Sequence, residues 1–291
     1  MDNERYPYWP MPERPAIRWP NGARVAFWVI PNIEHFRFDV ASNDAARGGA
    51  RPDVYSFAQR DYGARVGVWR MMDTMDKYGV RASVTLNSDV CTFEPQIIKA
   101  GVARNWEWLG HGISNSEPLT GLDEVTERTL IQTVVRTITE HTGQPPQGWL
   151  GPGLGETFNT PDLLAEAGIT YVCDWTADDQ PFPMRVKSGR MITVPYATEL
   201  NDIPAFARKG HTPEQFFRMI CDQFDVLYDE GKDSGRVMAL ALHPYLTGHP
   251  FRIRWFDRAL EYITRHEGVW VTTGGEIARW YYDHYYDAAP K

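Results

Sequence analysis

The sequence predicts an α/β protein whose mostly parallel strands form an irregular (β/α) barrel of about seven strands. Short apolar segments of strand length alternate with longer segments in which apolar residues recur at helical spacing. This alternation continues over nearly the whole chain, with no internal repeat, low-complexity tract or linker. A length of 291 residues is ordinary for one barrel-type domain. We therefore expect residues 1–291 to form a single domain.

The first elements are read from the N-terminus. Residues 1–22 contain five prolines and two tryptophans, so we expect a Pro/Trp-rich arm on the surface rather than a helix. The apolar run RVAFWVI at 24–30 is typical of a strand buried on both faces. Residues 39–62 are polar and glycine-rich, which predicts a long loop of the kind that carries function.

The remaining elements follow the same two patterns. Helical spacing, caps and terminal glycines predict helices at 64–78, 125–141, 160–168, 212–227 and 256–263. Apolar runs of strand length predict further strands at 81–86, 106–110, 148–150, 169–173, 236–242 and 269–272.

Bulk composition narrows the class of function. The net charge is -8 and Lys and Arg are scattered, whereas a face that binds nucleic acid needs a surplus of positive charge. Cys91, Cys173 and Cys221 form no close pair and no metal-binding spacing, which is typical of a reducing compartment. The N-terminus has no apolar signal region, and no window approaches the ~18 apolar residues of a membrane span. We expect a cytoplasmic protein with no nucleic-acid or membrane partner.

Polar and turn-forming residues follow the expected strands, where a parallel barrel gathers its active site. In chain order they are Asn32 and Glu34, Asn87, His111, the segment 151–153, the segment 174–179 and His243.

Several segments together resemble the polysaccharide deacetylase superfamily, and within it the allantoinase-like and cyclic imide hydrolase branch. The resemblance covers about residues 6–280. It is carried by the order and spacing of WPNGARVAFWVIPNIE at 19–34, DYGARVGVWR at 61–70, HGISN at 111–115, ADDQPF at 177–182 and LALHPYLTGHPFR at 240–252. The resemblance implies a barrel of the polysaccharide deacetylase type, a catalytic domain over 1–291, and a homo-oligomer, with a tetramer favoured.

Two positions depart from the pattern of that superfamily. Its deacetylases carry two aspartates after the first strand, one as the base and one as a metal ligand, and this chain has Asn32 and Glu34 there. Asn32 has no proton-accepting group at neutral pH. The usual H-x-x-x-H metal pair reads His111 to Asn115, and Asn is a poor zinc ligand. Glu34 and His111 remain to hold one divalent ion, zinc by preference, that is weakly bound or absent, in keeping with the reduced metal dependence of the allantoinase-like branch.

The resemblance and the chemistry of the side chains assign roles. Glu34 activates water, His111 holds the ion or polarises a carbonyl, and His243 protonates the leaving nitrogen. Asp178 is a further catalytic candidate, although Asp178 and Asp179 fit a simple turn equally well. The expected substrate contacts are Asn32, Asn115, Gly153, Trp175, Asp179, Tyr245 and Arg252. We expect a closed aromatic pocket walled by Trp175, Phe182 and Tyr245.

The function expected from these features is hydrolysis of C–N bonds in a small cyclic amide, such as a cyclic imide, a hydantoin or an allantoin-type ureide. N-deacetylation of a glycan or of peptidoglycan is the alternative within enzymes, but the chain shows no export signal and lacks the full metal triad. A catalytically inactive binding protein on the same fold is the third hypothesis, and the retention of Glu34, His111 and His243 argues against it.

Overall fold

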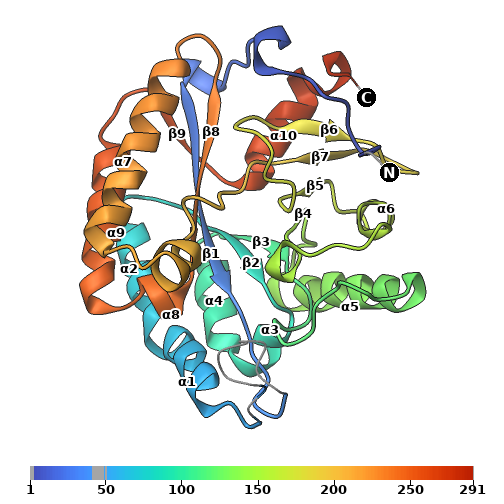
Figure 1. The fold of residues 1–291 in the computed structure, drawn as a ribbon, viewed down its shortest axis with the longest axis vertical. Helices are drawn as coiled ribbons and strands as arrows, with labels where there is room; N and C mark the ends of the chain where they lie inside the picture. Colours follow the sequence, from blue (N-terminus) through green and yellow to red (C-terminus); the bar gives the residue numbers. More distant parts are fainter. Residues whose placement is uncertain (1–2, 41–48, 50, 291) are drawn as a thin grey trace.

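The computed structural model describes residues 3–40, 49 and 51–290, which form a curled sheet with helices packed around it (Figure 1). The strands are β1 (Val25–Ile33), β2 (Ser83–Leu86), β3 (Glu107–Gly110), β4 (Gly148–Trp149), β5 (Tyr171–Val172), β6 (Phe182–Met184), β7 (Met191–Thr193), β8 (Arg236–Leu242) and β9 (Val269–Val271). Their order is β6-β7-β5-β4-β3-β2-β1-β8, and β9 pairs with β1. Among these strands only β6 and β7 pair in antiparallel fashion. The predicted α/β fold with a curled, mostly parallel sheet is confirmed.

The β6–β7 pair is the part of the sheet that the sequence did not predict. Each strand has three residues, and β6 contains Pro183. Runs this short show no clear period, and proline is rare within strands. After β7 the chain returns to β8, where an isolated parallel bridge joins Asn201 to Ala241. The curl is therefore completed by an irregular segment rather than by a continuous ladder.

Strand β1 lies at the centre of the fold and fixes where the site forms. All nine of its residues are buried, as expected for a strand covered on both faces. It pairs with β8 over seven residues, from Val25 opposite Arg236 to Pro31 opposite Leu242. The residues that follow β1 and β8 therefore emerge side by side at the C-terminal edge of the sheet.

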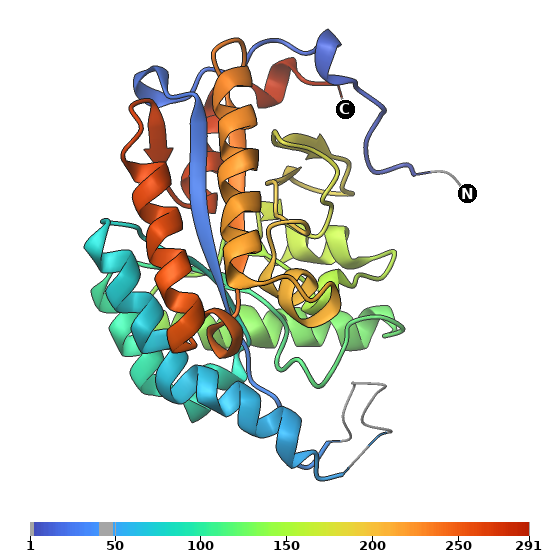
Figure 2. The ribbon, with the colours of Figure 1, turned by 60° about the vertical axis from the view of Figure 1, so that its left-hand side comes forward.

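Helices cover the outside of the sheet (Figures 1 and 2). They are α1 (Val54–Tyr62), α2 (Val68–Lys77), α3 (Asp89–Phe93), α4 (Pro95–Ala103), α5 (Glu124–Thr142), α6 (Thr160–Glu166), α7 (Pro213–Glu230), α8 (Pro244–Thr247), α9 (Pro250–Thr264) and α10 (Gly274–His284). Helix α7 begins with the predicted capping box of Thr212 and Gln215. Helix α7 packs against α9, and the two run beside β1 and β8 (Figure 2). No helix in the described part of the chain is long and apolar enough to cross a membrane.

The expected loop at 39–62 is wrong over its second half. Helix α1 occupies Val54–Tyr62 and continues through a π-helical turn at Gly63–Gly67 into α2. Residues 41–48 of the expected loop lie outside the described residues. The helix begins at Asp53, whose side chain accepts a hydrogen bond from the Ser56 amide. Helix α1 buries none of its residues fully, so its sequence lacks the apolar period that marked α2.

Residues 3–22 cross the surface as an arm with short 3-10 turns at Met11–Glu13 and Pro20–Gly22. Trp19 anchors the arm, because its ring is buried and its Nε1 donates to the Arg236 carbonyl at 3.0 Å.

Candidate active site

Three ionisable side chains from different strands converge at the C-terminal edge of the sheet. Glu34 follows β1, His111 follows β3 and His243 follows β8. Glu34 Oε1 lies 3.5 Å from His111 Nε2 and 3.5 Å from His243 Nε2. The side chains are only 8%, 2% and 4% exposed, respectively. The sequence predicted all three as catalytic, and the structure brings them together around one carboxylate oxygen.

His243 is held by a carboxylate that the sequence did not identify. Asp202 Oδ1 lies 2.7 Å from His243 Nδ1, and Asp202 Oδ2 accepts from the His243 backbone amide at 2.8 Å. Thr247 Oγ1 also donates to Asp202 Oδ2 at 2.6 Å. Asp202 is fully buried. Its carboxylate therefore fixes the ring orientation and holds a proton on Nδ1, so that Nε2 faces Glu34.

His111 is oriented by the backbone rather than by a carboxylate. Its Nδ1 lies 2.6 Å from the carbonyl oxygen of Leu150, the residue directly after β4. A carbonyl only accepts, so Nδ1 carries the proton and Nε2 of the neutral ring carries a lone pair. Nε2 is buried and has no hydrogen-bond partner among the described residues. In the neutral form His111 is thus a proton acceptor that faces Glu34.

The charges of the cluster are set by its members. Burial alone would raise the pKa of Glu34, but the positive charge of His243 lowers this pKa well below its usual range. Burial alone would lower the pKa of His243, but the carboxylates of Asp202 and Glu34 raise it to about 9. At neutral pH Glu34 is therefore an anion and His243 a cation. A protonated Nε2 suits His243 to donate a proton.

Asn87, which follows β2, ties three segments of the site together. Its Oδ1 accepts from the His35 amide at 2.9 Å, and its Nδ2 donates to the His111 carbonyl and to Asn115 Oδ1, the latter at 3.0 Å. The Asn115 amide in turn donates to the His35 carbonyl at 3.0 Å. Asn115, a predicted substrate contact, therefore lies beside the segments that carry Glu34 and His111.

Asn32, a second predicted substrate contact, makes hydrogen bonds within the protein. Its Oδ1 accepts from Thr85 Oγ1 at 2.7 Å and from the Tyr196 hydroxyl at 3.2 Å. Its Nδ2 donates to the carbonyls of Ile30 and Leu242 at 3.2 and 3.3 Å. Both ends of the amide are satisfied. In this arrangement Asn32 joins β1, β2 and β8, and it also lines the cavity beside Glu34.

A small cavity lies beside Glu34, with about 20 Å³ of space for the centres of water molecules. Tyr245 and Arg60 are among the side chains that line it. Tyr245 packs edge-on against the His243 ring, with 5.9 Å between ring centroids, so this predicted aromatic wall is in place. The cavity depends on Gly63, because a Cβ there would lie 2.7 Å from the Tyr245 amide nitrogen.

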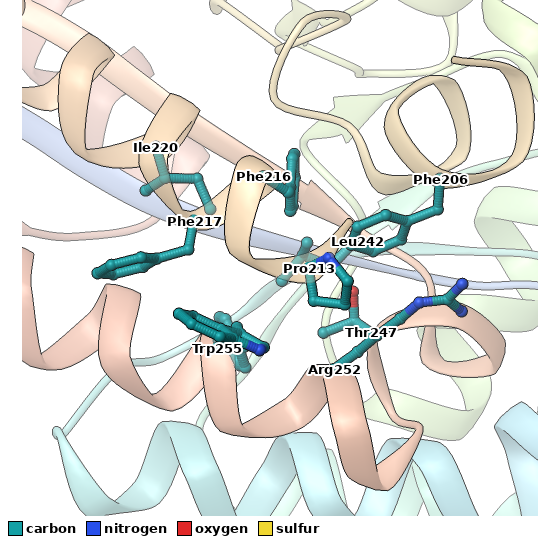
Figure 3. Close-up of a pocket in the computed structure, with 10 residues that line it drawn as sticks. Phe206, Pro213, Phe216, Phe217, Ile220, Leu242, Thr247, Arg252 and Trp255 are labelled. Atoms are coloured by element: carbon teal, nitrogen blue, oxygen red, sulfur yellow. The ribbon is translucent and has the colours of Figure 1, made fainter. Parts of the chain in front are cut away.

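A second pocket, with about 10 Å³ of space for the centres of water molecules, lies between α7 and α9 (Figure 3). It is mainly apolar and includes Leu242 and Thr247. Arg252 and Phe206 both line this pocket (Figure 3). Arg252 Nη1 donates to the Leu246 carbonyl at 3.3 Å, and its guanidinium lies 4.5 Å from the Phe206 ring centroid. The predicted substrate contact Arg252 thus lies beside the His243–Thr247 segment.

The expectation that Asp178 and Asp179 belong to the site needs correction. Asp178 pairs with Arg14 of the N-terminal arm at 2.5 Å and accepts from the Gln180 amide at 2.9 Å. The Asp179 carbonyl accepts from the Val237 amide near the start of β8. His243 lies six residues further along this strand, a distance of roughly 20 Å. Turn formation and anchoring of the arm account for both aspartates.

Trp175 also lies elsewhere, and the expected aromatic pocket is wrong in two of its three walls. Trp175 Nε1 donates to both carboxylate oxygens of Glu156 at 3.1 Å, and its ring packs against Tyr6 of the arm. Phe182 packs against the other side of Tyr6, at 4.6 Å between centroids. Gly153 is exposed after β4, in a left-handed conformation (φ 65°), and its predicted contact with substrate stays a prediction.

The donor set does not fit a tightly held zinc ion. Among the described residues no group of three or more His, Cys, Asp or Glu side chains is placed to hold a metal. Structural and catalytic zinc sites use three or four protein ligands. The Asn115 side chain, at the position of the second histidine of the H-x-x-x-H pair, accepts from Asn87. The chemistry available from Glu34, His111 and His243 is therefore acid–base chemistry of the side chains themselves.

Comparison with known proteins agrees with this geometry. The model of the polysaccharide deacetylase family matches residues 57–172. A curated relative from Schizosaccharomyces pombe, named provisionally as a polysaccharide deacetylase, is 29% identical over 93% of this chain and 94% of its own length.

Two solved structures superpose over nearly the whole chain. A probable polysaccharide deacetylase from Pseudomonas aeruginosa PAO1 has a TM-score of 0.83 and 29% identity, over 94% of this chain and 95% of its own. The PuuE allantoinase has a TM-score of 0.83 and 28% identity over the same shares. The similarity thus extends to one neighbour named for a sugar polymer and one named for a small cyclic ureide.

Proposed function

Since this chain belongs to the polysaccharide deacetylase superfamily and is a hydrolase of carbon–nitrogen bonds, we propose that it opens the rings of small cyclic amides. The observation that carries the proposal is the buried cluster in which Glu34 Oε1 faces the Nε2 atoms of His111 and His243. The likeness to the PuuE allantoinase supports a cyclic ureide, hydantoin or imide as the substrate.

The first step that we propose is attack by water on a ring carbonyl. The 3.5 Å between Glu34 Oε1 and His111 Nε2 is too long for a direct hydrogen bond, and both atoms accept. A water molecule that donates to both is oriented and polarised by them. Its oxygen attacks the carbonyl carbon, and its proton passes to Glu34 or His111. His111 acts here as an acceptor, because polarising a carbonyl would require a proton on Nε2.

The second step breaks the C–N bond. An amide nitrogen leaves poorly as an anion, so it needs a proton as the bond breaks. His243, with its pKa raised to about 9, supplies that proton from Nε2. Asp202 stabilises the protonated ring before the transfer and holds its orientation afterwards. The product is an open-chain amide or ureide with a new carboxyl group.

The cavity beside Glu34 has room for the attacking water. Its space for the centres of water molecules is about 20 Å³, which is enough for about one water. The small size of the substrate is therefore proposed from the likeness to the PuuE allantoinase. N-deacetylation of a glycan remains the second candidate, supported by the names of the Schizosaccharomyces and Pseudomonas proteins.

A substrate screen tests the proposal. Purified protein is incubated with succinimide, hydantoin, allantoin and N-acetylglucosamine oligomers, with and without chelator. We expect ring opening of at least one cyclic amide and no release of acetate. Acetate release without ring opening would establish the second candidate, and no turnover of either class would favour an inactive binding protein.

Two substitutions test the roles of His243 and Glu34, measured with the cyclic amide that the parent protein hydrolyses fastest. His243→Ala removes the proton donor, so kcat falls by about 10²–10⁴-fold while KM changes little. Glu34→Gln keeps the shape and removes the charge, and we expect a loss at least as large. Glu261→Gln on α9, far from the cluster in sequence and outside the cavity, serves as the matched control. If both variants stay within a few-fold of the parent, these roles are wrong.

A further inference from the structure

We propose that Arg60 binds the carboxylate of the ring-opened product, which makes it a specificity-determining residue of this site. The proposal rests on the proposed function for the identity of the ligand. It rests on the structure for the position and state of the Arg60 side chain. Arg60 comes from α1, which the sequence did not predict, and no motif singled it out.

Arg60 faces the same cavity as Glu34 and Tyr245. Its guanidinium lies between two aromatic rings, 4.5 Å from the centroid of Phe36 and 4.6 Å from that of Tyr245. Stacking of this kind holds a planar guanidinium in one orientation and leaves its edges available. The group is therefore arranged before a ligand arrives.

The N–H groups of this guanidinium make few hydrogen bonds within the protein. Nε of Arg60 is buried and has no hydrogen-bond partner among the described residues, and Nη1 makes one long contact, at 3.5 Å, with the Ser56 carbonyl. No carboxylate of the described part of the chain lies within the 4.0 Å of an ion pair with Arg60. Nearby Arg37, by contrast, pairs with Asp89 and Glu117. A half-buried arginine that has no anionic partner is a suitable binding site for an anionic ligand.

The charge of the cluster explains why such a group is needed. Glu34 is an anion that already faces His243, the cation of this cluster. A cyclic amide enters as a neutral molecule, but hydrolysis leaves a carboxylate beside Glu34. Arg60 adds a positive charge on the same cavity and offers two parallel N–H groups, the geometry that a carboxylate accepts best.

The test compares two ligands that differ only in charge. Succinamate is the ring-opened product of succinimide, and succinamide is its neutral analogue of the same size. Calorimetric binding to the full chain gives the ratio of their affinities without any turnover. We expect the parent to prefer succinamate by about tenfold, as for a hydrogen bond to a charged group, and Arg60→Met to abolish the preference.

Two further variants separate recognition from packing. Arg65→Met removes an exposed arginine from the same continuous helix, and the preference should remain. Arg60→Lys keeps the charge without the planar fork, so part of the preference should remain. If thermal melting shows that Arg60→Met is unfolded, Arg60→Gln is measured in its place.

The result that overturns the proposal is a parent without preference, or a folded Arg60→Met with the preference of the parent. The outcome is distinguishable from failure of the proposed function. If cyclic amides are not hydrolysed but the preference is present and depends on Arg60, the proposed function fails and the carboxylate site stands. If cyclic amides are hydrolysed and the preference is absent, only the carboxylate site fails.

Discussion

Asp202 shows how much of the chemistry of a histidine depends on a residue distant in sequence. Its carboxylate binds both the ring and the backbone amide of His243. In the sequence it stands in NDIP at 201–204, which has the appearance of an ordinary turn. The single bridge from Asn201 to Ala241 carries Asp202 to the end of β8. The sequence offered no signal for this role, because helix α7 separates Asp202 from β8 along the chain.

The pH dependence of turnover follows from this pair. His243 must be protonated to act as the acid, so we expect kcat to hold from neutral pH to about pH 9 and to fall above it, as the pKa of His243 is passed. Glu34 keeps its charge at low pH because its pKa is lowered. We therefore expect no fall of kcat near the usual pKa of a glutamate that could be assigned to Glu34.

Asp202→Asn should move the basic limb to lower pH by about 1–3 pH units, since one nearby opposite charge shifts a pKa by that amount. Asp229→Asn, at an exposed ion pair of α7, is the control and should leave the profile in place. A profile of Asp202→Asn identical to that of the parent would show that Asp202 does not set the pKa of His243.

The two acceptors at Glu34 and His111 also predict the metal content. With no group of three ligands among the described residues, we expect at most one weakly held divalent ion per chain. Elemental analysis after dialysis against a chelator should find well below one equivalent of zinc. A stoichiometric zinc that survives this treatment would contradict the prediction.

At the scale of elements, the junction of α1 and α2 positions the site. The π-helical turn at Gly63–Gly67 packs against α8, the short helix that follows His243. A Cβ on Gly67 would lie 2.1 Å from the Pro244 carbonyl oxygen, which is closer than any side chain tolerates. The two glycines thus allow the close approach that brings Arg60 and Tyr245 into one cavity.

Gly67→Ala tests this junction. Either the helix or α8 must shift, so we expect a loss of about 1–3 kcal/mol in the free energy of unfolding, as for overpacked cores, together with a lower kcat. Urea unfolding and steady-state kinetics measure the two effects. Asp73→Ala, at an exposed position of α2, should change the unfolding free energy by less than about 0.5 kcal/mol. Equal stability of Gly67→Ala and the parent would show that the contact is not tight.

At the scale of the molecule, the aromatic C-terminal segment 280–287 packs on its own chain. Tyr281 and Tyr286 are buried, Trp280 Nε1 donates to the Arg18 carbonyl, and the Tyr282 hydroxyl donates to the Thr170 carbonyl. The segment therefore packs within one chain, and these aromatic residues by themselves give no reason to expect an oligomer. Exposed aromatic rings remain elsewhere, with Tyr8 and Phe158 both 89% exposed.

The homo-oligomer therefore stays a prediction that rests on family resemblance and on the remaining exposed rings. We expect light scattering at micromolar concentration to give four times the 33.3 kDa mass of one chain. Replacing Tyr8 and Phe158 by serine should weaken assembly if these rings lie in the contact. A mass of one chain for the parent protein would refute the prediction.

The sequence by itself determined the alternation of strands and helices along most of the chain and the three residues of the cluster. Alternation of apolar runs with helical spacing is a local property, and β1 and β8 are long enough to show it. Parallel strands present their C-terminal ends at one edge, so Glu34, His111 and His243 were expected together. The same rule gave a wrong prediction for Asp178 and Asp179, because their segment runs back to the start of β8.

Only the tertiary structure decided the partners of these residues. Asp202, Leu150 and Arg60 reach the cluster from segments that carry no motif, and their roles depend on contacts across the fold. The proton positions on the two histidines follow from those contacts and not from the histidines themselves. Hydrogen bonding and burial act between segments far apart in the chain, so a local pattern names the reacting groups but does not set their charge.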